Sequence, residues 1–75
     1  MKIVLEQQGR HLEMYVAHDP NNQFNLDWDA AIADMAAELD HRQGVKRMSY
    51  DVWYWDLRKK HEAEEYITYF YLKHQ

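Results

Sequence analysis

The chain has 75 residues, 47% of them apolar and 15% aromatic, and its 13 acidic and 9 basic residues give a net charge of −4. This length predicts one domain, residues 1–75, whose small core buries about 60% of the surface that the unfolded chain exposes. The apolar content excludes a disordered chain, and the absence of cysteine excludes disulfides and thiolate metal sites. The apolar run at residues 1–5 is too short for a signal peptide or a membrane span, so a cytoplasmic protein is expected.

Two strands are predicted first, over residues 2–7 and 11–17, because apolar and polar residues alternate in both. Gly9 lies between them and can adopt the positive φ angle of a tight hairpin turn. The segment Asp19-Pro20-Asn21-Asn22 follows as a turn, since proline fixes φ while Asp and Asn bond their own backbone.

A helix is predicted from about Asp27, where the apolar period changes to that of a helix. Its apolar stripe comprises Trp28, Ala31, Ile32, Met35, Ala36 and Leu39. Asp27 can cap the first turn, while His41 and Arg42 suit the negative end of the helix dipole. Gly44 is the expected stop.

Two segments rich in Tyr, Trp, Val, Ile, Thr and Phe follow, at residues 48–57 and 66–73, and their composition favours a second hairpin. The fold class is therefore α+β, arranged ββαββ, with an antiparallel sheet of two hairpins and one helix across one face. An alternative is left open for the C-terminal segment. A helical stripe is also possible there, formed by Ala63, Tyr66, Ile67, Phe70 and Tyr71.

Eight of the eleven aromatic residues lie in these last two segments. If Val52, Phe70 and Leu72 face the helix, neighbouring side chains must point away from it, because successive strand residues alternate between faces. The residues predicted to point away are Trp53, Trp55, Tyr69 and Tyr71. Together they could expose several hundred Å² of aromatic surface, which predicts a protein-docking surface or a homodimer packed sheet on sheet.

Acidic residues are concentrated in the middle of the chain. Between His11 and His41 there are seven acidic residues and no Lys or Arg, about −7, while the other residues hold six acids and nine bases, about +3. The seven are Glu13, Asp19, Asp27, Asp29, Asp34, Glu38 and Asp40. On the predicted helix, Asp27, Asp34 and Glu38 form one solvent-facing line, which is either a solvated face or a stripe that binds a basic partner.

Nucleic-acid binding is an alternative, because basic residues flank the aromatic strand and single strands bind through stacked bases and paired phosphates. Trp53 and Trp55 would supply the stacking, and the charges would come from a basic cluster. That cluster is Arg58, Lys59 and Lys60. Asp51 and Asp56 interrupt the same strand and weaken this interpretation.

Catalysis is not expected, because neither Ser49 nor Thr68 lies in a nucleophile motif and two glycines cannot build a phosphate-binding loop. His11, His18 and His41 match no metal-ligand spacing, so no metal or cofactor is expected. We therefore expect a small acidic, non-enzymatic protein-binding module that inhibits a partner by covering a basic or nucleic-acid-binding site. By size and charge alone, it is analogous to inhibitors carried by phages and mobile elements. A purely structural homodimer subunit is the remaining alternative.

Overall fold

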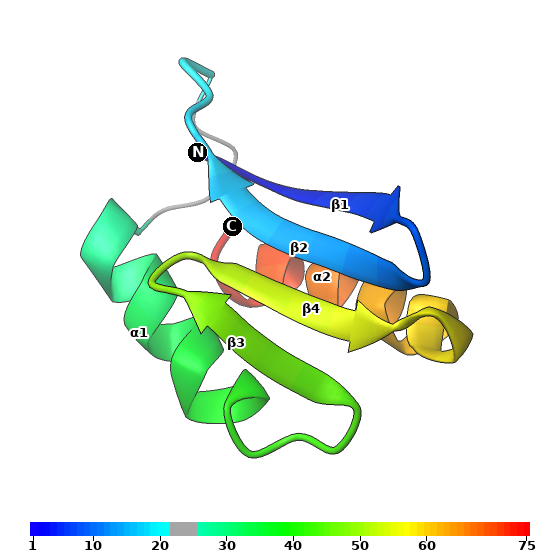
Figure 1. Ribbon diagram of the computed structural model, residues 1–75. Helices are drawn as coiled ribbons and strands as arrows, with labels where there is room; N and C mark the ends of the chain where they lie inside the picture. The colour runs from blue at the N-terminus through cyan, green and yellow to red at the C-terminus, as the bar shows by residue number, and fades with distance from the viewer. Residues whose placement is uncertain (22–25) are drawn as a thin grey trace.

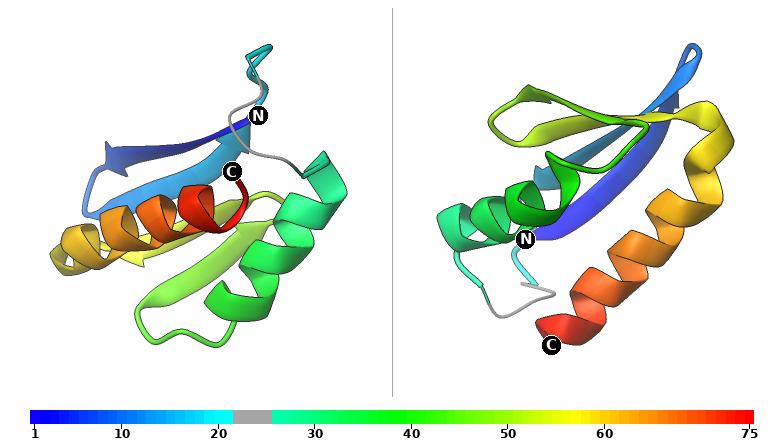
Figure 2. Two further views of the ribbon diagram at one scale, coloured as in Figure 1. Left: turned by 180° about the vertical axis from the view of Figure 1, so that it is seen from behind. Right: turned by 90° about the horizontal axis from the view of Figure 1, so that it is seen from below.

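The computed structural model describes residues 1–21 and 26–75. In chain order the elements are β1 (Lys2–Gln8), β2 (His11–Ala17), α1 (Trp28–Leu39), β3 (Val45–Ser49), β4 (Val52–Asp56), a 3-10 turn (Leu57–Lys59) and α2 (Lys60–Lys73). The strands form one antiparallel sheet in the order β1-β2-β4-β3 (Figure 1). Both helices lie on the same face of this sheet, as the two further views in Figure 2 show. The α+β class is confirmed.

The first hairpin and α1 form as predicted. Gly9 has φ +62° in the turn between β1 and β2, and the backbone amide of Asn21 donates to Asp19 Oδ1 over 2.9 Å. Asp27 caps α1 by accepting from the amide of Ala30 over 2.7 Å. The predicted position of Asn22 lies outside the described residues. The predicted stripe of α1 is also correct, with Ala31, Ile32, Met35 and Leu39 buried.

The preferred prediction of a C-terminal strand at residues 66–73 is wrong, and the helical alternative is correct. The buried residues of α2 are Ala63, Tyr66 and Phe70, whose spacing of three and four residues is that of a helix. A second helix is also needed physically. Four strands about 4.8 Å apart make a sheet wider than one helix, which is about 10–12 Å across.

The second hairpin consists of β3 and β4, so the single strand predicted over residues 48–57 is in fact divided by a turn. Arg47 fixes this turn by donating from Nε to the carbonyl of Ser49 (3.3 Å) and from Nη2 to the carbonyl of Tyr50 (2.7 Å). The β-rich composition of residues 48–57 was therefore interpreted correctly, but the turn within it was missed.

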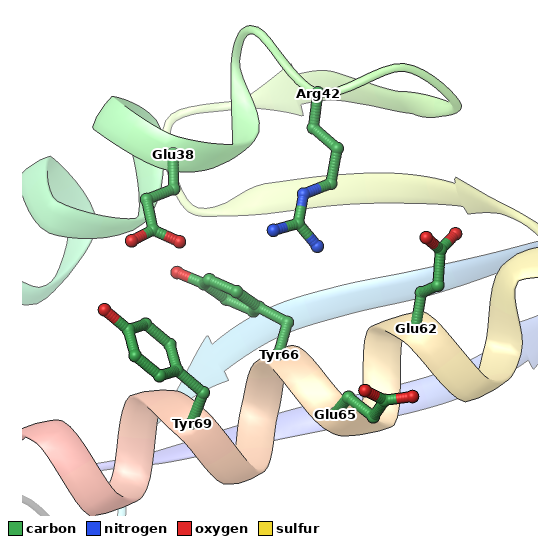
Figure 3. A pocket seen from close by; sticks show the side chains of 6 residues that line it. All are labelled: Glu38, Arg42, Glu62, Glu65, Tyr66 and Tyr69. Carbon is green, nitrogen blue, oxygen red and sulfur yellow. The ribbon is translucent and has the colours of Figure 1, made fainter.

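The end of α1 also differs from the prediction, because the helix ends at Leu39 and is capped by Asp40. His41 and Arg42 therefore lie beyond the last turn. The Arg42 amide donates to the carbonyl of Leu39 over 3.1 Å, and Gly44 follows with φ +84°. This short connection brings the Arg42 side chain over the space between the two helices, as Figure 3 shows.

The core lies between the sheet and the two helices. Its largest fully buried side chains are Trp53, Trp55, Phe70, Leu12, Met14, Ile32, Met35 and Leu39. The opposite face of the sheet carries no helix among the described residues. No described helix is long and apolar enough to cross a membrane.

Candidate functional site

A cleft of about 350 Å³ lies between the end of α1 and the middle of α2. We call it the interhelix cleft. Its lining residues are Glu38, Arg42, Glu62, Glu65, Tyr66 and Tyr69. In Figure 3 the two tyrosine rings project from α2 toward α1, with Glu38 opposite them and Arg42 above. The cleft thus combines an aromatic wall with charged groups from both helices.

Arg42 is held in the cleft by aromatic rings. Its guanidinium carbon lies 5.6 Å from the ring centre of Trp55 and 5.5 Å from that of Tyr66, within the range of a cation–π interaction. Among the described residues, no carboxylate forms an ion pair with this guanidinium. Its N–H donors therefore remain available in the cleft.

The tyrosines of the cleft differ in exposure and so in role. Tyr66 is only 4% exposed, and burial raises the pKa of its phenol, with further contributions from the charges of Glu38 and Asp34. This phenol therefore stays protonated near neutral pH and is not a base. Tyr69 is 48% exposed, and its ring centre lies 6.4 Å from that of Tyr66. It offers the contact surface.

Negative charge dominates the cleft, because three glutamates line it against one arginine. Glu62 is paired with Lys59 over 3.2 Å, and Glu65 with His61 over 2.7 Å. Glu38 forms no ion pair among the described residues, so its carboxylate is the one most available to a ligand.

An ion-pair cluster joins the two helices beside the cleft. Asp34 of α1 accepts from Lys73 Nζ over 3.0 Å, and the Nε2 atom of His74 lies 2.7 Å from its other oxygen. Partial burial alone raises the pKa of Asp34, but hydrogen bonds from His74 and Lys73 outweigh it and lower this pKa below 3.8. Lys73 Nζ also lies 5.6 Å from the ring centre of Tyr69.

The three acidic residues predicted to share one solvent-facing line are therefore placed differently. Asp34 and Glu38 are half-buried and face α2, whereas only Asp27 is exposed, as the cap of α1. The structure brings together Asp34, Glu38 and Tyr69, three of the predicted protein-binding residues. The predicted solvent-facing line of Asp27, Asp34 and Glu38 is not formed.

The predicted orientation of Trp53 and Trp55 is wrong. Both point toward the helices and are 0% and 1% exposed, while Val52 faces the open side of the sheet. Trp53 Nε1 donates to Asp40 Oδ1 over 2.9 Å. The alternation along β4 therefore has the opposite phase to the predicted one. The physical reason is that two helices, not one, cover the same face of the sheet, so the largest apolar side chains are buried there. These tryptophans are core residues.

Tyr71 also lies elsewhere than predicted. It is half-buried on α2, and its hydroxyl accepts a hydrogen bond of 2.8 Å from the backbone amide of Ile3. Four aromatic residues were predicted to point outward from the sheet, namely Trp53, Trp55, Tyr69 and Tyr71. Of these four, Tyr69 alone is exposed.

The basic cluster predicted for nucleic-acid binding is split between ion pairs and a groove. Arg58 pairs with Asp56 over 2.8 Å, which with the Arg58 amide lowers the pKa of Asp56 to about 2. Lys59 pairs with Glu62, and Lys60 lies at the edge of a different groove beside β1. Because Trp53 and Trp55 are buried, no aromatic platform for stacked bases lies among these cations.

The histidines do not form a metal site in the described part of the chain, where no group of three His, Asp or Glu side chains is placed to hold an ion. His11 instead stacks on Tyr54 with ring centres 3.9 Å apart, on the face of the sheet that carries no described helix.

Sequence reasoning missed four residues of the cleft, namely Arg42, Glu62, Glu65 and Tyr66. The signal was present in the helical spacing of Glu62, Glu65, Tyr66 and Tyr69, which places all four along one side of a helix. It was overlooked because only residues 66–73 were assigned to a strand, while Glu62 and Glu65 were assigned to the connection before it, residues 58–65, so the four were not considered as one helix face.

The chain matches no protein-family model, and neither the curated proteins nor the solved structures gave a match.

Proposed function

We propose that this protein is a non-enzymatic protein-binding module whose interhelix cleft binds a basic segment of a partner protein. The observation that carries the proposal is the cleft itself, in which the unpaired carboxylate of Glu38 and the exposed ring of Tyr69 lie together. Tyrosine is enriched at binding hot spots because it combines a large apolar area with a polar tip.

The chemistry of the cleft favours a cationic ligand. Three carboxylates, the Arg42 guanidinium and the Lys59 ammonium paired with Glu62 give it a formal charge of about −1. A lysine or arginine of the partner could pair with Glu38 and stack on Tyr69, as Lys73 already stacks on the same ring. Arg42 would add specificity, because its free donors match a backbone carbonyl or a carboxylate of the partner.

The same cleft favours binding over catalysis. Its side chains are carboxylates, one guanidinium and two phenols, and burial keeps the Tyr66 phenol protonated. The lining contains no serine, threonine, cysteine or histidine that could act as a nucleophile or a proton shuttle. A module of this size acts most simply as an inhibitor, by covering a basic functional site of its partner.

Affinity capture from a lysate, with and without nuclease, tests this function. We expect a protein partner that survives nuclease treatment and binds the wild type. Replacing Glu38 by Lys, or Tyr69 by Ala, should reduce its recovery at least about tenfold, since charge reversal leaves the partner cation facing a like charge.

Glu13→Lys is the matched control, because it makes the same change of charge on the opposite face of the sheet. It should retain the partner. Recovery of nucleic acid alone, or equal loss of the partner with Glu13→Lys and Glu38→Lys, would contradict the proposal.

A further inference from the structure

A second groove, of about 470 Å³, runs between the edge strand β1 and the opposite side of α2 from the interhelix cleft. We call it the β1 groove. Its apolar lining is Ile3, Leu5, Leu12 and Ile67, of which Leu5 and Ile67 are partly exposed. Its polar rim includes Gln7 and Thr68. Figure 2 shows β1 and α2 running side by side in opposite directions.

The backbone of β1 faces this groove with unused hydrogen-bonding groups. The amide of Ile3 donates to Tyr71 of α2, so the backbone groups of Ile3 point away from β2. Because these directions alternate along an antiparallel strand, the groups of Leu5 and Gln7 point the same way. No described residue accepts from either of these two amides.

We propose that β1 binds an extended segment of a partner protein, which adds a fifth strand to the sheet and places alternate apolar side chains in the β1 groove. The expected occupant is an extended segment, because an extended strand carries the row of N–H and C=O groups that can pair with the outward backbone groups of β1. Its alternate side chains would meet Leu5 and Ile67, since every second residue of a strand points to one face.

Tyr71 sets one end of this site. By holding the amide of Ile3, it limits pairing to Leu5 and Gln7, which offer two N–H and two C=O groups to the added strand. The site therefore takes a short segment.

A second copy of the chain fits this edge poorly. Two β1 strands from two copies could pair antiparallel in several registers. If the pairing is centred on Val4 or Leu5, the Ile3 amide must donate to the other copy, but it already donates to the Tyr71 hydroxyl. A register centred on Glu6 places two glutamates directly opposite each other, which is destabilising. A foreign segment without an acidic residue at that position avoids both conflicts.

A defined peptide tests the proposal. The probe is an N-acetylated, C-amidated nonapeptide of alternating threonine and valine with a lysine at each end. Binding should shift the amide signals of Leu5, Gln7 and Ile67 in a heteronuclear NMR titration, and it should slow hydrogen exchange at the Leu5 and Gln7 amides. A peptide N-methylated at all seven core residues should lose this binding, because neither of its edges can then donate to β1.

Gln7→Pro provides the matching change in the protein. It removes an outward N–H that the pairing of β1 with β2 does not use, and proline is tolerated at such edge positions. We expect peptide affinity to fall at least about tenfold, whereas Gln7→Ala, which keeps the N–H, should stay within about twofold. Glu38→Lys, in the interhelix cleft, should leave binding of this peptide unchanged.

Four outcomes would overturn the proposal. They are unchanged exchange at Leu5 and Gln7 with saturating peptide, equal binding of the N-methylated peptide, unchanged affinity of a folded Gln7→Pro variant, and loss of binding in Glu38→Lys. The N-methylated peptide keeps the test decisive if Gln7→Pro does not fold. Because the two sites lie on opposite sides of α2, failure here leaves the proposed function intact.

Discussion

Asp40 connects three elements of the fold through its backbone and its side chain. Its backbone amide caps α1 by donating to the carbonyl of Ala36 over 3.1 Å, while its carboxylate accepts from Trp53 Nε1 over 2.9 Å and pairs with Arg47 over 3.2 Å. The guanidinium of Arg47 in turn lies 5.1 Å from the ring centre of Trp53. The buried indole N–H thus has its partner at the surface, and the end of α1 is tied to β3 and β4.

Asp40→Ala should therefore lower the free energy of unfolding by about 1–3 kcal/mol, the cost of leaving a buried donor unpaired. Asp40→Asn keeps an acceptor for the indole and should cost less. Urea denaturation followed by tryptophan fluorescence measures both variants. Equal stability of Asp40→Ala and the wild type would show that Trp53 finds another partner.

Leu39 tests the burial of α1 most simply, since it is 0% exposed in the core. Leu39→Ala should cost about 2–5 kcal/mol, the usual range for a large-to-small change in a packed interior. Ala33→Ser, on the exposed side of the same helix, should change stability by less than about 0.5 kcal/mol. A neutral Leu39→Ala would mean that α1 packs on the sheet through another face.

At the scale of elements, sequence patterns predicted β1, β2 and α1 because each has one clear period and a recognisable turn or cap, such as Gly9 and Asp27. The strand prediction for residues 66–73 was wrong because their composition fits a strand and their apolar spacing also fits a helix. Packing against the rest of the fold decides between the two, and composition does not reveal it. Three of the four cleft residues on α2, namely Glu62, Glu65 and Tyr66, were missed with that choice, whereas Glu38 and Tyr69 were named. Burial of Trp53 and Trp55 depended on the same missing helix.

The ion pairs of Asp34 hold α2 against α1, and their contribution should depend on pH. The pKa of Asp34 is lower in the folded protein than its usual value of 3.8. The contribution is therefore fully present above pH 3.8 and is lost as the pH falls through the folded pKa below it. Asp34→Asn should remove this part of the pH dependence.

Denaturation of the wild type and Asp34→Asn at several pH values from 6 to 2 measures this effect. The difference in unfolding free energy between them should shrink as the pH falls below 4. Asp56→Asn serves as a comparison, because the pKa of Asp56 is about 2 through its bond with Arg58 and that pair does not join the helices. A constant difference between wild type and Asp34→Asn across this range would contradict the assignment.

At the scale of the whole molecule, the excess of acidic residues is not spread evenly over a solvated face. Asp34 and Glu38 lie between the helices, and Glu62 and Glu65 from the C-terminal segment join them there. The fold thus brings acids from distant parts of the sequence to one side of the molecule. Under the proposed function, this charge arrangement should steer a basic partner toward the cleft.

Partner binding should consequently weaken with salt. The association rate should fall steeply between about 50 and 300 mM salt, because the Debye length shortens over this range. Glu38→Lys should reduce this dependence while leaving the unfolding curve close to that of the wild type. Stopped-flow measurements with the captured partner provide the test, and a salt-independent rate would contradict electrostatic steering.

Site-specific photo-crosslinking tests the central claim most directly. A photoreactive benzoylphenylalanine would replace the tyrosine at position 69 in the cleft, at position 15 on the open face of the sheet, or at position 50 directly after β3. We predict a nuclease-resistant protein adduct from position 69 that disappears when Glu38 is replaced by Lys. Adducts from position 15 or 50 but not from 69, or adducts to nucleic acid, would contradict the account.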